Sequence, residues 1–350
     1  MPDPTLELSY AYGPPGLRGI IRARPEDFEV EEVLRFEPAG DGEHAFLKIR
    51  KRNLNTRAVA QLIAKHAGTR TGEVGYAGMK DRNAVTTQWF SVGLAGRSEP
   101  DWSALEDDAL QVLQATRHKK KLRPGQLQRN RFRITLRQVE GDAEEIDARL
   151  ERIRCGGVPN YFGPQRFGRD GGNLEAARAL FLGGRRVRDR KLKGIYLSAA
   201  RAEVFNQVLS ARVAAGSWNR ALPGEVVMFD DSRSRFPMHD EAPGDDPRIA
   251  SLQLHPTGPL WGNGSPDAAG EAAAVEREAV KLLSELTSGL EAAGLKADRR
   301  ALRLRVDDLT CETYGQDALT VEFALRPGAY ATMVLRELLQ IGDASADQPG

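Results

Sequence analysis

The stretch GYAGMKDRNAVTTQWFSV, residues 75–92, places one carboxylate between two cations immediately before a β-rich run. The small residues of its first part, 75–78, allow a tight turn or the close approach of a ligand to the backbone. The following segment, 85–92, is rich in β-branched and aromatic side chains, which predicts a strand. We therefore expect Asp81 to lie on a loop that leads into a buried strand.

The residues beside Asp81 bear on its chemistry. Lys80 and Arg82 flank it and would favour its ionised form, which suits a nucleophile or a base better than an acid. An arbitrary Lys-Asp-Arg triplet, however, is usually a solvated charge cluster on a turn. The triplet alone does not distinguish a catalytic carboxylate from a surface one.

The longer context resembles the signature of the tRNA pseudouridine synthase D (TruD) family, in which an Ala-Gly-x-Lys-Asp segment carries the catalytic aspartate. Other segments of this chain resemble further blocks of the family and occur in the same order. They are residues 25–32, 42–44, 55–56, 129–132, 158–168, 198–201 and 327–332. Several blocks in order are far more specific than any one of them, and together they span nearly the whole chain.

The resemblance implies an α+β fold. It implies a pseudouridine-synthase catalytic domain, with a mixed, largely antiparallel sheet and flanking helices, and an inserted α/β TRUD domain. Transferred to this chain, residues 1–155 and 305–350 form the catalytic domain, and residues 156–304 form the insertion. Apolar and polar residues alternate over 131–137 and 319–325, which is typical of strands with one buried face and favours an antiparallel or mixed sheet.

Helices are predicted by apolar periodicity and by capping residues. They cover residues 56–68, 142–154, 198–216, 271–294 and 329–341. Ser198 is the expected N-cap of the third helix.

Composition is compatible with this assignment. A chain of 350 residues with 41% hydrophobic residues can form two domains with ordinary cores. The N-terminal segment has neither a basic region nor an apolar run, and no segment approaches the length of a membrane span, so we expect a cytoplasmic protein without membrane attachment. Cys155 and Cys311 have no paired spacing, and the histidines are scattered, so we expect no metal site and no disulfide. There is no P-loop or dinucleotide fingerprint. We expect no nucleotide cofactor, no other cofactor and a monomeric protein.

The net charge of +1 hides an uneven distribution. Residues 117–137 contain many lysines and arginines with no acid between them, and a second basic run covers residues 185–193. Such runs suit phosphate contacts along an RNA backbone, although either run alone could be an ordinary solvated surface. The candidates for RNA-backbone contact are Lys119, Lys120, Lys121, Arg123 and Arg131, together with Arg166 from the 158–168 block.

The reaction that the resemblance implies is isomerisation of uridine-13 in the D arm of tRNA to pseudouridine. One carboxylate could attack the base, attack the sugar carbon or remove a sugar proton, and the sequence leaves these three routes open. A stacked uridine must first be flipped out, so the pocket needs an aromatic surface and cations. The resemblance assigns catalysis to Asp81 and substrate binding to Phe28, Asn130, Phe132 and Tyr330, with Arg22 and Lys80 pairing with or supporting the aspartate.

Two residues depart from the family pattern. Lysine is usual at the position of Arg22, and arginine there could pair bidentately with Asp81. Phenylalanine is usual at the position of Tyr330, and tyrosine keeps the aromatic face but adds a hydroxyl that needs a partner.

Two other functions compete with the synthase assignment. A non-catalytic RNA-binding protein or RNA chaperone would explain the basic runs but not Asp81. An enzyme acting on another small nucleotide would need Asp81 but not the extended basic surfaces, and its binding would be insensitive to salt.

Overall fold

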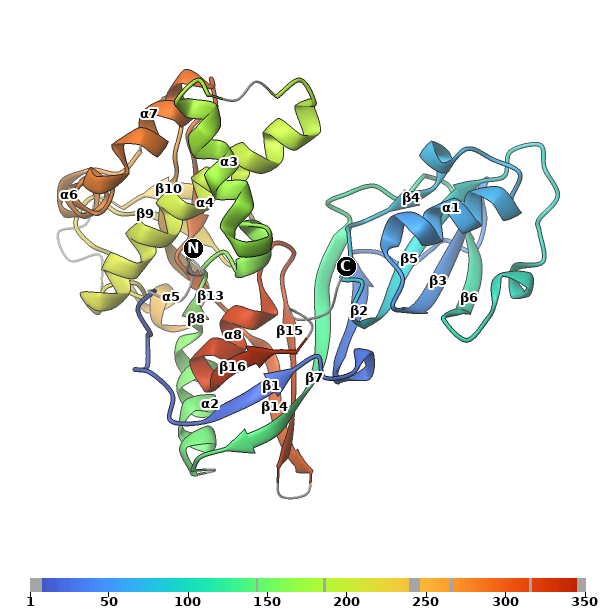
Figure 1. Cartoon of the computed structure of the whole chain (residues 1–350), viewed down its shortest axis with the longest axis horizontal. Helices are drawn as coiled ribbons and strands as arrows, with labels where there is room; N and C mark the ends of the chain where they lie inside the picture. Colours follow the sequence, from blue (N-terminus) through green and yellow to red (C-terminus); the bar gives the residue numbers. More distant parts are fainter. Residues whose placement is uncertain are drawn as a thin grey trace. The chain divides into compact units, whose positions relative to one another are not determined.

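The computed structural model describes residues 8–142, 144–184, 187–238, 246–264, 267–314 and 317–344. They form two compact units, each assembled from separate stretches of the chain. We call the unit within residues 16–143, 307–328 and 339–350 the sheet unit. The unit within residues 1–15, 144–306 and 329–338 is the helical unit. Figure 1 shows their elements in the colours of the sequence.

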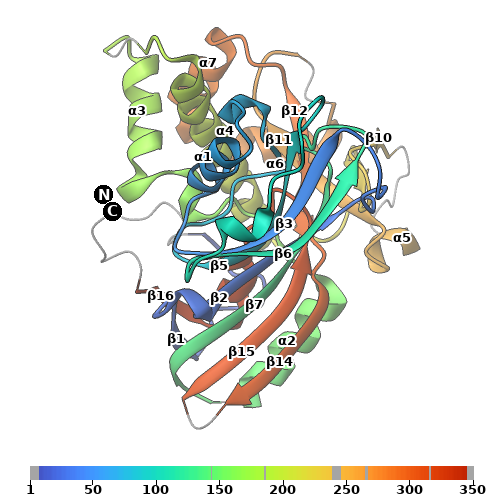
Figure 2. The ribbon, with the colours of Figure 1, turned by 90° about the vertical axis from the view of Figure 1, so that its right-hand side faces the viewer.

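A ten-stranded sheet forms the framework of the sheet unit. Its main path, in spatial order, is β14 (Asp307–Tyr314), β15 (Ala318–Leu325), β7 (Leu127–Glu140), β2 (Phe28–Leu34), β5 (Val85–Gly93), β3 (His44–Arg52) and β6 (Leu110–His118). Three short strands are attached to it, namely β1 (Arg18–Ile21), β16 (Gln340–Asp343) and β4 (Gly75–Tyr76). The pairs β2–β5 and β1–β16 are parallel and the other pairs are antiparallel. The predicted mixed, largely antiparallel sheet is therefore confirmed (Figure 2).

The alternation predicted for β7 has the expected consequence. Ile134 and Leu136 are fully buried, whereas Arg131 and Arg133 are exposed on the other face. Helix α1 (Thr56–His66) packs the apolar residues of one side against β3 and β5, and the side chain of Asn55 caps its first turn. These contacts bury the part of the sheet on which α1 lies.

The helical unit is centred on the long helix α4 (Arg190–Ala214), and α3 (Gly172–Phe181), α6 (Gly270–Ala279) and α7 (Ser284–Ala292) pack against it. A four-stranded sheet has the order β10 (Arg235–Pro237), β9 (Val226–Phe229), β11 (Leu254–Leu260) and β12 (Asp298–Ala301). The remaining elements of the unit are α2 (Glu144–Gly156), α5 (Pro247–Ala250), α8 (Ala331–Leu338) and the antiparallel pair β8 (Val158–Pro159) and β13 (Arg303–Leu304). The expected combination of helices and sheet is thus present.

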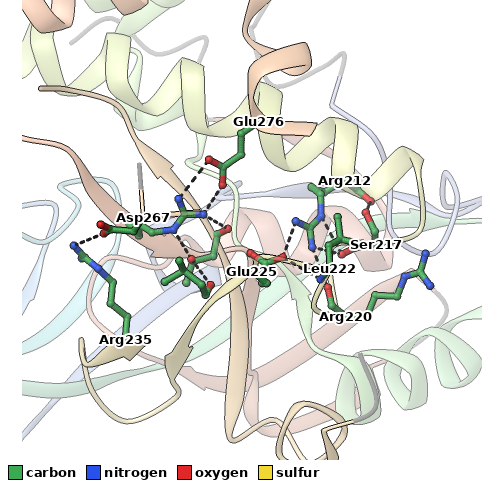
Figure 3. A network of polar contacts seen from close by, with 11 residues as sticks. Arg212, Ser217, Arg220, Leu222, Glu225, Arg235, Asp267 and Glu276 are labelled. Atoms are coloured by element: carbon green, nitrogen blue, oxygen red, sulfur yellow. Dashed lines mark hydrogen bonds and ion pairs between the residues drawn. The ribbon is translucent and has the colours of Figure 1, made fainter. Parts of the chain in front are cut away.

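Buried ion pairs lie within this unit (Figure 3). Arg212 of α4 contacts Glu225 at 2.8 Å, and both side chains are almost completely buried. Arg299 of β12 contacts Glu276 of α6 in the same way. Burial raises the pKa of Glu276, although Arg299 opposes that shift. These pairs connect α4 and α6 to the turn before β9 and to β12.

Three helix predictions need correction. The third predicted helix begins at Arg190 rather than at Ser198, because the Asp189 carboxylate accepts from the backbone N–H groups of residues 191 and 192 and caps the helix earlier. The helix predicted over 271–294 is broken into α6 and α7 by a turn at Val280, which lets both pieces pack on α4. The helix predicted over 329–341 ends at Leu338, where the chain enters β16 and leaves the helical unit.

Within the described ranges, we find no helix of the length and hydrophobicity needed to span a membrane.

Candidate active site

Asp81 lies on the loop between β4 and β5, as the sequence predicts, and its side chain is 51% exposed. The next strand, β5, is buried along most of its length. The carboxylate is therefore accessible to a substrate while its loop is attached to the core of the sheet unit.

Buried polar groups hold the loop on the side of Lys80. The backbone N–H of Lys80 donates to Thr56 Oγ1 at 3.0 Å, and that hydroxyl donates to Gln88 Oε1 at 3.0 Å. The ammonium of Lys80 contacts Glu32 Oε1 at 2.5 Å, with Lys80 7% exposed and Glu32 fully buried. The expectation that Lys80 pairs with the carboxylate of Asp81 is therefore corrected, because the ammonium is directed into the sheet and pairs with Glu32.

Lys51 of β3 holds the other side of the same loop. Its ammonium donates to the carbonyl oxygens of Leu54 at 2.6 Å and Asp81 at 3.2 Å, and its side chain is fully buried. Burial lowers the pKa of Lys51 to about 8, and the charge of Asp81 opposes that shift. The backbone of Asp81 is thus anchored by Lys51, just as the backbone of Lys80 is anchored by Thr56.

Arg22, directly after β1, contacts the carboxylate of Asp81. Its Nη2 lies 3.4 Å from Asp81 Oδ2, while its Nη1 donates to Asp343 Oδ2 at 2.6 Å. The bidentate pair that we considered for Arg22 and Asp81 is therefore not formed, since two carboxylates share the guanidinium. Arg22 also has a φ of +56°, which is uncommon for a residue with a side chain and is found at functional sites.

An aromatic surface continues from Arg22. The guanidinium lies 4.1 Å from the centroid of the Phe28 ring, and Phe28 packs edge-on against Phe132 with centroids 6.2 Å apart. Phe132 in turn stacks on Phe323 at 5.3 Å. Contacts therefore link the Asp81 carboxylate through Arg22 to three aromatic rings.

The register of the sheet places these residues on one face, which we call the site face. One row across five strands pairs Lys51 with Thr86, Thr86 with Val30, Val30 with Phe132 and Phe132 with Phe323. Directly paired residues project from the same side of a sheet. The row thus runs from Lys51, which binds the carbonyl oxygen of Asp81, to the aromatic residues Phe132 and Phe323.

Asn130 belongs to the next row of the site face, where it pairs with Glu32 and Leu325. Its Oδ1 is buried and has no hydrogen-bond partner within the described residues, and the same holds for Thr86 Oγ1. Buried polar atoms normally have partners, so an unpaired acceptor on this face is a position that a ligand donor could satisfy.

Tyr330 and Arg166 belong to the helical unit and contact each other there. Arg166 Nε donates to the Tyr330 hydroxyl at 3.0 Å, and Nη1 donates to Ser198 Oγ at 3.1 Å. Tyr330 packs edge-on against Phe162. The hydroxyl that distinguishes Tyr330 from phenylalanine therefore has a partner, and the guanidinium of Arg166 is oriented by two neutral oxygens.

The basic run 117–137 is less uniform in three dimensions than in sequence. Several of its members pair with acids from distant segments, as Arg117 does with Glu99, Arg129 with Asp307, Arg133 with Glu322 and Arg137 with Asp27. The candidates for RNA-backbone contact vary in this respect. Lys119 contacts Asp41 at 3.4 Å with both side chains 67% exposed, and Lys121 donates to a backbone carbonyl. Lys120, Arg123 and Arg131 are exposed and form no ion pair with the described residues.

In the second basic run, residues 185 and 186 lie outside the described residues. The described residues also hold no cluster of three or more histidine, cysteine, aspartate or glutamate side chains that could bind a metal ion.

Comparison with known proteins identifies the family. The model of the family tRNA pseudouridine synthase D (TruD) matches residues 7–184 and 174–338. The chain belongs to the TruD family. The predicted enzyme class is confirmed with it, since this is a family of tRNA pseudouridine synthases, which are isomerases.

Individual TruD proteins match over nearly their full length. The tRNA pseudouridine synthase D of Methylococcus capsulatus is 51% identical over 334 residues, which cover 95% of this chain and 94% of that protein. The Nitrosococcus oceani protein is 47% identical, with 96% and 95% covered. A solved structure from Methanosarcina mazei, assigned to TruD, has a TM-score of 0.74 at 24% identity, with 95% of each chain covered, and supports the fold.

Two charged residues below the Asp81 loop, Lys51 and Glu32, were not predicted as part of the site, although the strand patterns contain a signal for them. Lys51 is in phase with the buried Leu47 and Ile49 of β3, and Glu32 is in phase with Phe28 and Val30 of β2. A charged residue at an inward position of an alternating strand must find a buried partner. The inward positions of Lys51 and Glu32 therefore indicate, from the sequence alone, that both charges have buried partners.

Proposed function

We propose that this TruD protein isomerises uridine-13 in the D arm of tRNA to pseudouridine, with Asp81 as its single catalytic carboxylate. The observation that carries the proposal is the half-exposed carboxylate of Asp81 on an anchored loop, in contact with an arginine that lies on Phe28. Membership of the family supports the reaction.

The isomerisation breaks the bond from C1′ to N1 and forms a bond from C1′ to C5. N1 gains a proton and C5 loses one, so the reaction is balanced without a redox partner, and we propose no cofactor. Asp81 attacks the base, attacks C1′ or removes a sugar proton, and all three steps require an accessible carboxylate. Its exposure and its contact with Arg22 suit each of these steps.

The aromatic surface of the site face is the proposed binding site for the flipped uracil. Phe28 and Phe132 would supply the rings on which a base removed from its stack can rest. The buried, unpaired Oδ1 of Asn130 would accept the N3–H of uracil, and cytosine has no N–H at that position. We also propose that Tyr330, in the helical unit, is a substrate-binding residue.

Six exposed or partly exposed cations are proposed to contact the RNA backbone. In the sheet unit these are Lys119, Lys120, Lys121, Arg123 and Arg131, and in the helical unit Arg166. Because Arg166 is oriented by neutral hydroxyl groups, its positive charge stays available to a phosphate. Each such contact should add to the salt dependence of tRNA binding.

The domain organisation also stays a proposal. We assign residues 1–155 and 305–350 to the catalytic domain and residues 156–304 to an inserted domain. We further propose that the protein acts in the cytoplasm, as a monomer and without membrane attachment.

Release of tritium from C5 of uridine tests the function. Wild-type protein should release tritium from tRNA transcripts labelled at C5, and Asp81→Asn should lose at least about 10³-fold in rate while keeping its affinity for tRNA. A transcript with cytidine at position 13 should give no release. Release from that transcript would contradict the assigned position, and undiminished release by Asp81→Asn would contradict the assigned catalyst. If wild-type protein bound tRNA without any release, a non-catalytic RNA-binding function would replace the proposed one.

A further inference from the structure

Lys51 occupies an unusual environment for a lysine. It lies on the inward face of β3, in phase with Leu47 and Ile49, and its side chain is fully buried. Its ammonium donates to two backbone carbonyl oxygens, whereas the carboxylates of Asp81 and Glu32 are in contact with other cations.

This arrangement is energetically costly. A buried ammonium normally needs an ion pair, and an unbranched apolar side chain would fill the same space without desolvating a charge. The lowered pKa of Lys51 reflects that cost. We therefore expect a structural role for the two hydrogen bonds of the ammonium, which an apolar residue could not form.

The position of those bonds shows what they hold. The carbonyl of Asp81 is bound by Lys51, and the N–H of the preceding residue, Lys80, is bound by Thr56. Two anchors on adjacent residues, one before and one after the Cα of Asp81, restrict the backbone from which the carboxylate projects. Arg22 contacts only the carboxylate itself, at 3.4 Å.

We propose that Lys51 is a positioning residue for the isomerisation, which fixes the direction of the Asp81 carboxylate through the hydrogen bond to the Asp81 carbonyl oxygen. This inference rests on the proposed function, because Asp81 is the catalyst there. Lys51 itself contacts neither the carboxylate nor, in this assignment, the substrate.

The test compares Lys51→Met with Lys48→Met. Methionine is unbranched like lysine and only one heavy atom shorter, but it has no donors. Lys48 lies on the same strand with its side chain on the opposite face, where it contacts Glu31 at 2.6 Å, so it is a matched control. The first measurement is the single-turnover rate of tritium release at saturating enzyme, together with the tRNA dissociation constant. The second is amide hydrogen exchange of residues 78–84, which include the bonded amides of Lys80 and Ala84.

We expect Lys51→Met to release tritium on the order of 10²-fold more slowly, because a small displacement of a catalytic group has an effect of this size. Its tRNA affinity should stay within twofold, and exchange of residues 78–84 should accelerate. Lys48→Met should match wild type in all three measurements. A rate for Lys51→Met within twofold of wild type overturns the proposal, and so does unchanged exchange.

The failure of this inference can be separated from failure of the proposed function. Absence of tritium release by wild-type protein overturns the function, and with it the role of Lys51. Release by wild type that is unaffected in Lys51→Met overturns the role of Lys51 alone. Should Lys51→Met not fold, Lys51→Gln keeps an N–H donor on a side chain too short to reach both carbonyls, and the same rate and exchange criteria apply to it.

Discussion

Loss of the ion pair between Lys80 and Glu32 should lower the free energy of unfolding more than loss of any other interaction described at the site. Both side chains are buried at 7% and 0% exposure, and the ammonium lies 2.5 Å from Glu32 Oε1. The other oxygen, Oε2, accepts from the backbone N–H of Trp89 at 3.2 Å. In Lys80→Met, Glu32 would keep that single hydrogen bond and lose the contacting cation.

The expected destabilisation follows from this geometry. Removing one partner of a buried ion pair typically costs about 3–5 kcal/mol, because the remaining charge is uncompensated. The charge of Glu32 also acts on Lys51, so one cation remains in its surroundings and the lower end of the range applies. With a urea m-value of about 2 kcal/mol/M, a loss of about 3 kcal/mol lowers the midpoint by about 1.5 M.

Tryptophan fluorescence can report the sheet unit by itself. Trp89 and Trp102 belong to that unit, and Trp218 and Trp261 belong to the helical unit. Urea titrations are therefore made in a background that carries phenylalanine at the latter two positions. This separates the two units, which need not unfold in one transition.

Two further variants complete the test of this pair. In Lys80→Met/Glu32→Gln no unpaired charge remains, so most of the lost stability should return. Arg50→Met breaks a half-exposed contact with Glu29, at 3.5 Å on the same sheet, and should cost less than about 1 kcal/mol. A loss below about 1 kcal/mol in Lys80→Met, or a double variant no more stable than the single one, would refute the assigned energetic role of the pair.

Three other predictions follow from the described contacts. In the helical unit, Arg212→Met leaves Glu225 buried without its cation and frees two carbonyl groups (Figure 3), so the free energy of unfolding should fall by about 3–5 kcal/mol. Chemical denaturation measures this change, and a loss under about 1 kcal/mol would argue against the role of the pair. The pKa of Lys51 is lowered from 10.5 to about 8, so between those pH values the unfolded chain binds more protons than the folded protein. The stability of wild type should therefore rise relative to that of Lys51→Met from about pH 8 to about pH 9.5, and parallel stability curves would contradict the burial of a charged Lys51. Tyr330→Phe removes the hydroxyl that accepts from Arg166 and should weaken tRNA binding about twofold to tenfold in filter-binding assays, with an unchanged dissociation constant as the contrary result.

The local pattern of the chain was sufficient for much of the fold. Small residues before a β-branched run predicted Asp81 on a loop leading into β5, and alternation in β7 predicted the burial of Ile134 and Leu136, whereas Phe132 on the same face is only partly buried. These features depend on neighbours within a few residues, where steric limits and side-chain periodicity act directly. For the same reason, the segments that resemble the TruD family can be recognised as continuous stretches of the sequence.

Helix ends were less predictable. Ser198 has the composition of an N-cap, yet Asp189 caps α4, because the cap is set by the residue whose side chain accepts from the first turn. The break at Val280 depends on how two helices pack on α4, which no local periodicity expresses.

The partners of charged residues depended on the tertiary structure throughout. Lys80 is adjacent to Asp81 in sequence but pairs with Glu32, and five of the nine lysines and arginines in the basic run 117–137 contact acids outside the run. Strand order and register decide these pairings, since they bring together side chains separated by tens to hundreds of residues. A buried charge pairs with whatever the register places opposite or beneath it, because desolvation makes an unmatched charge more costly than any local preference.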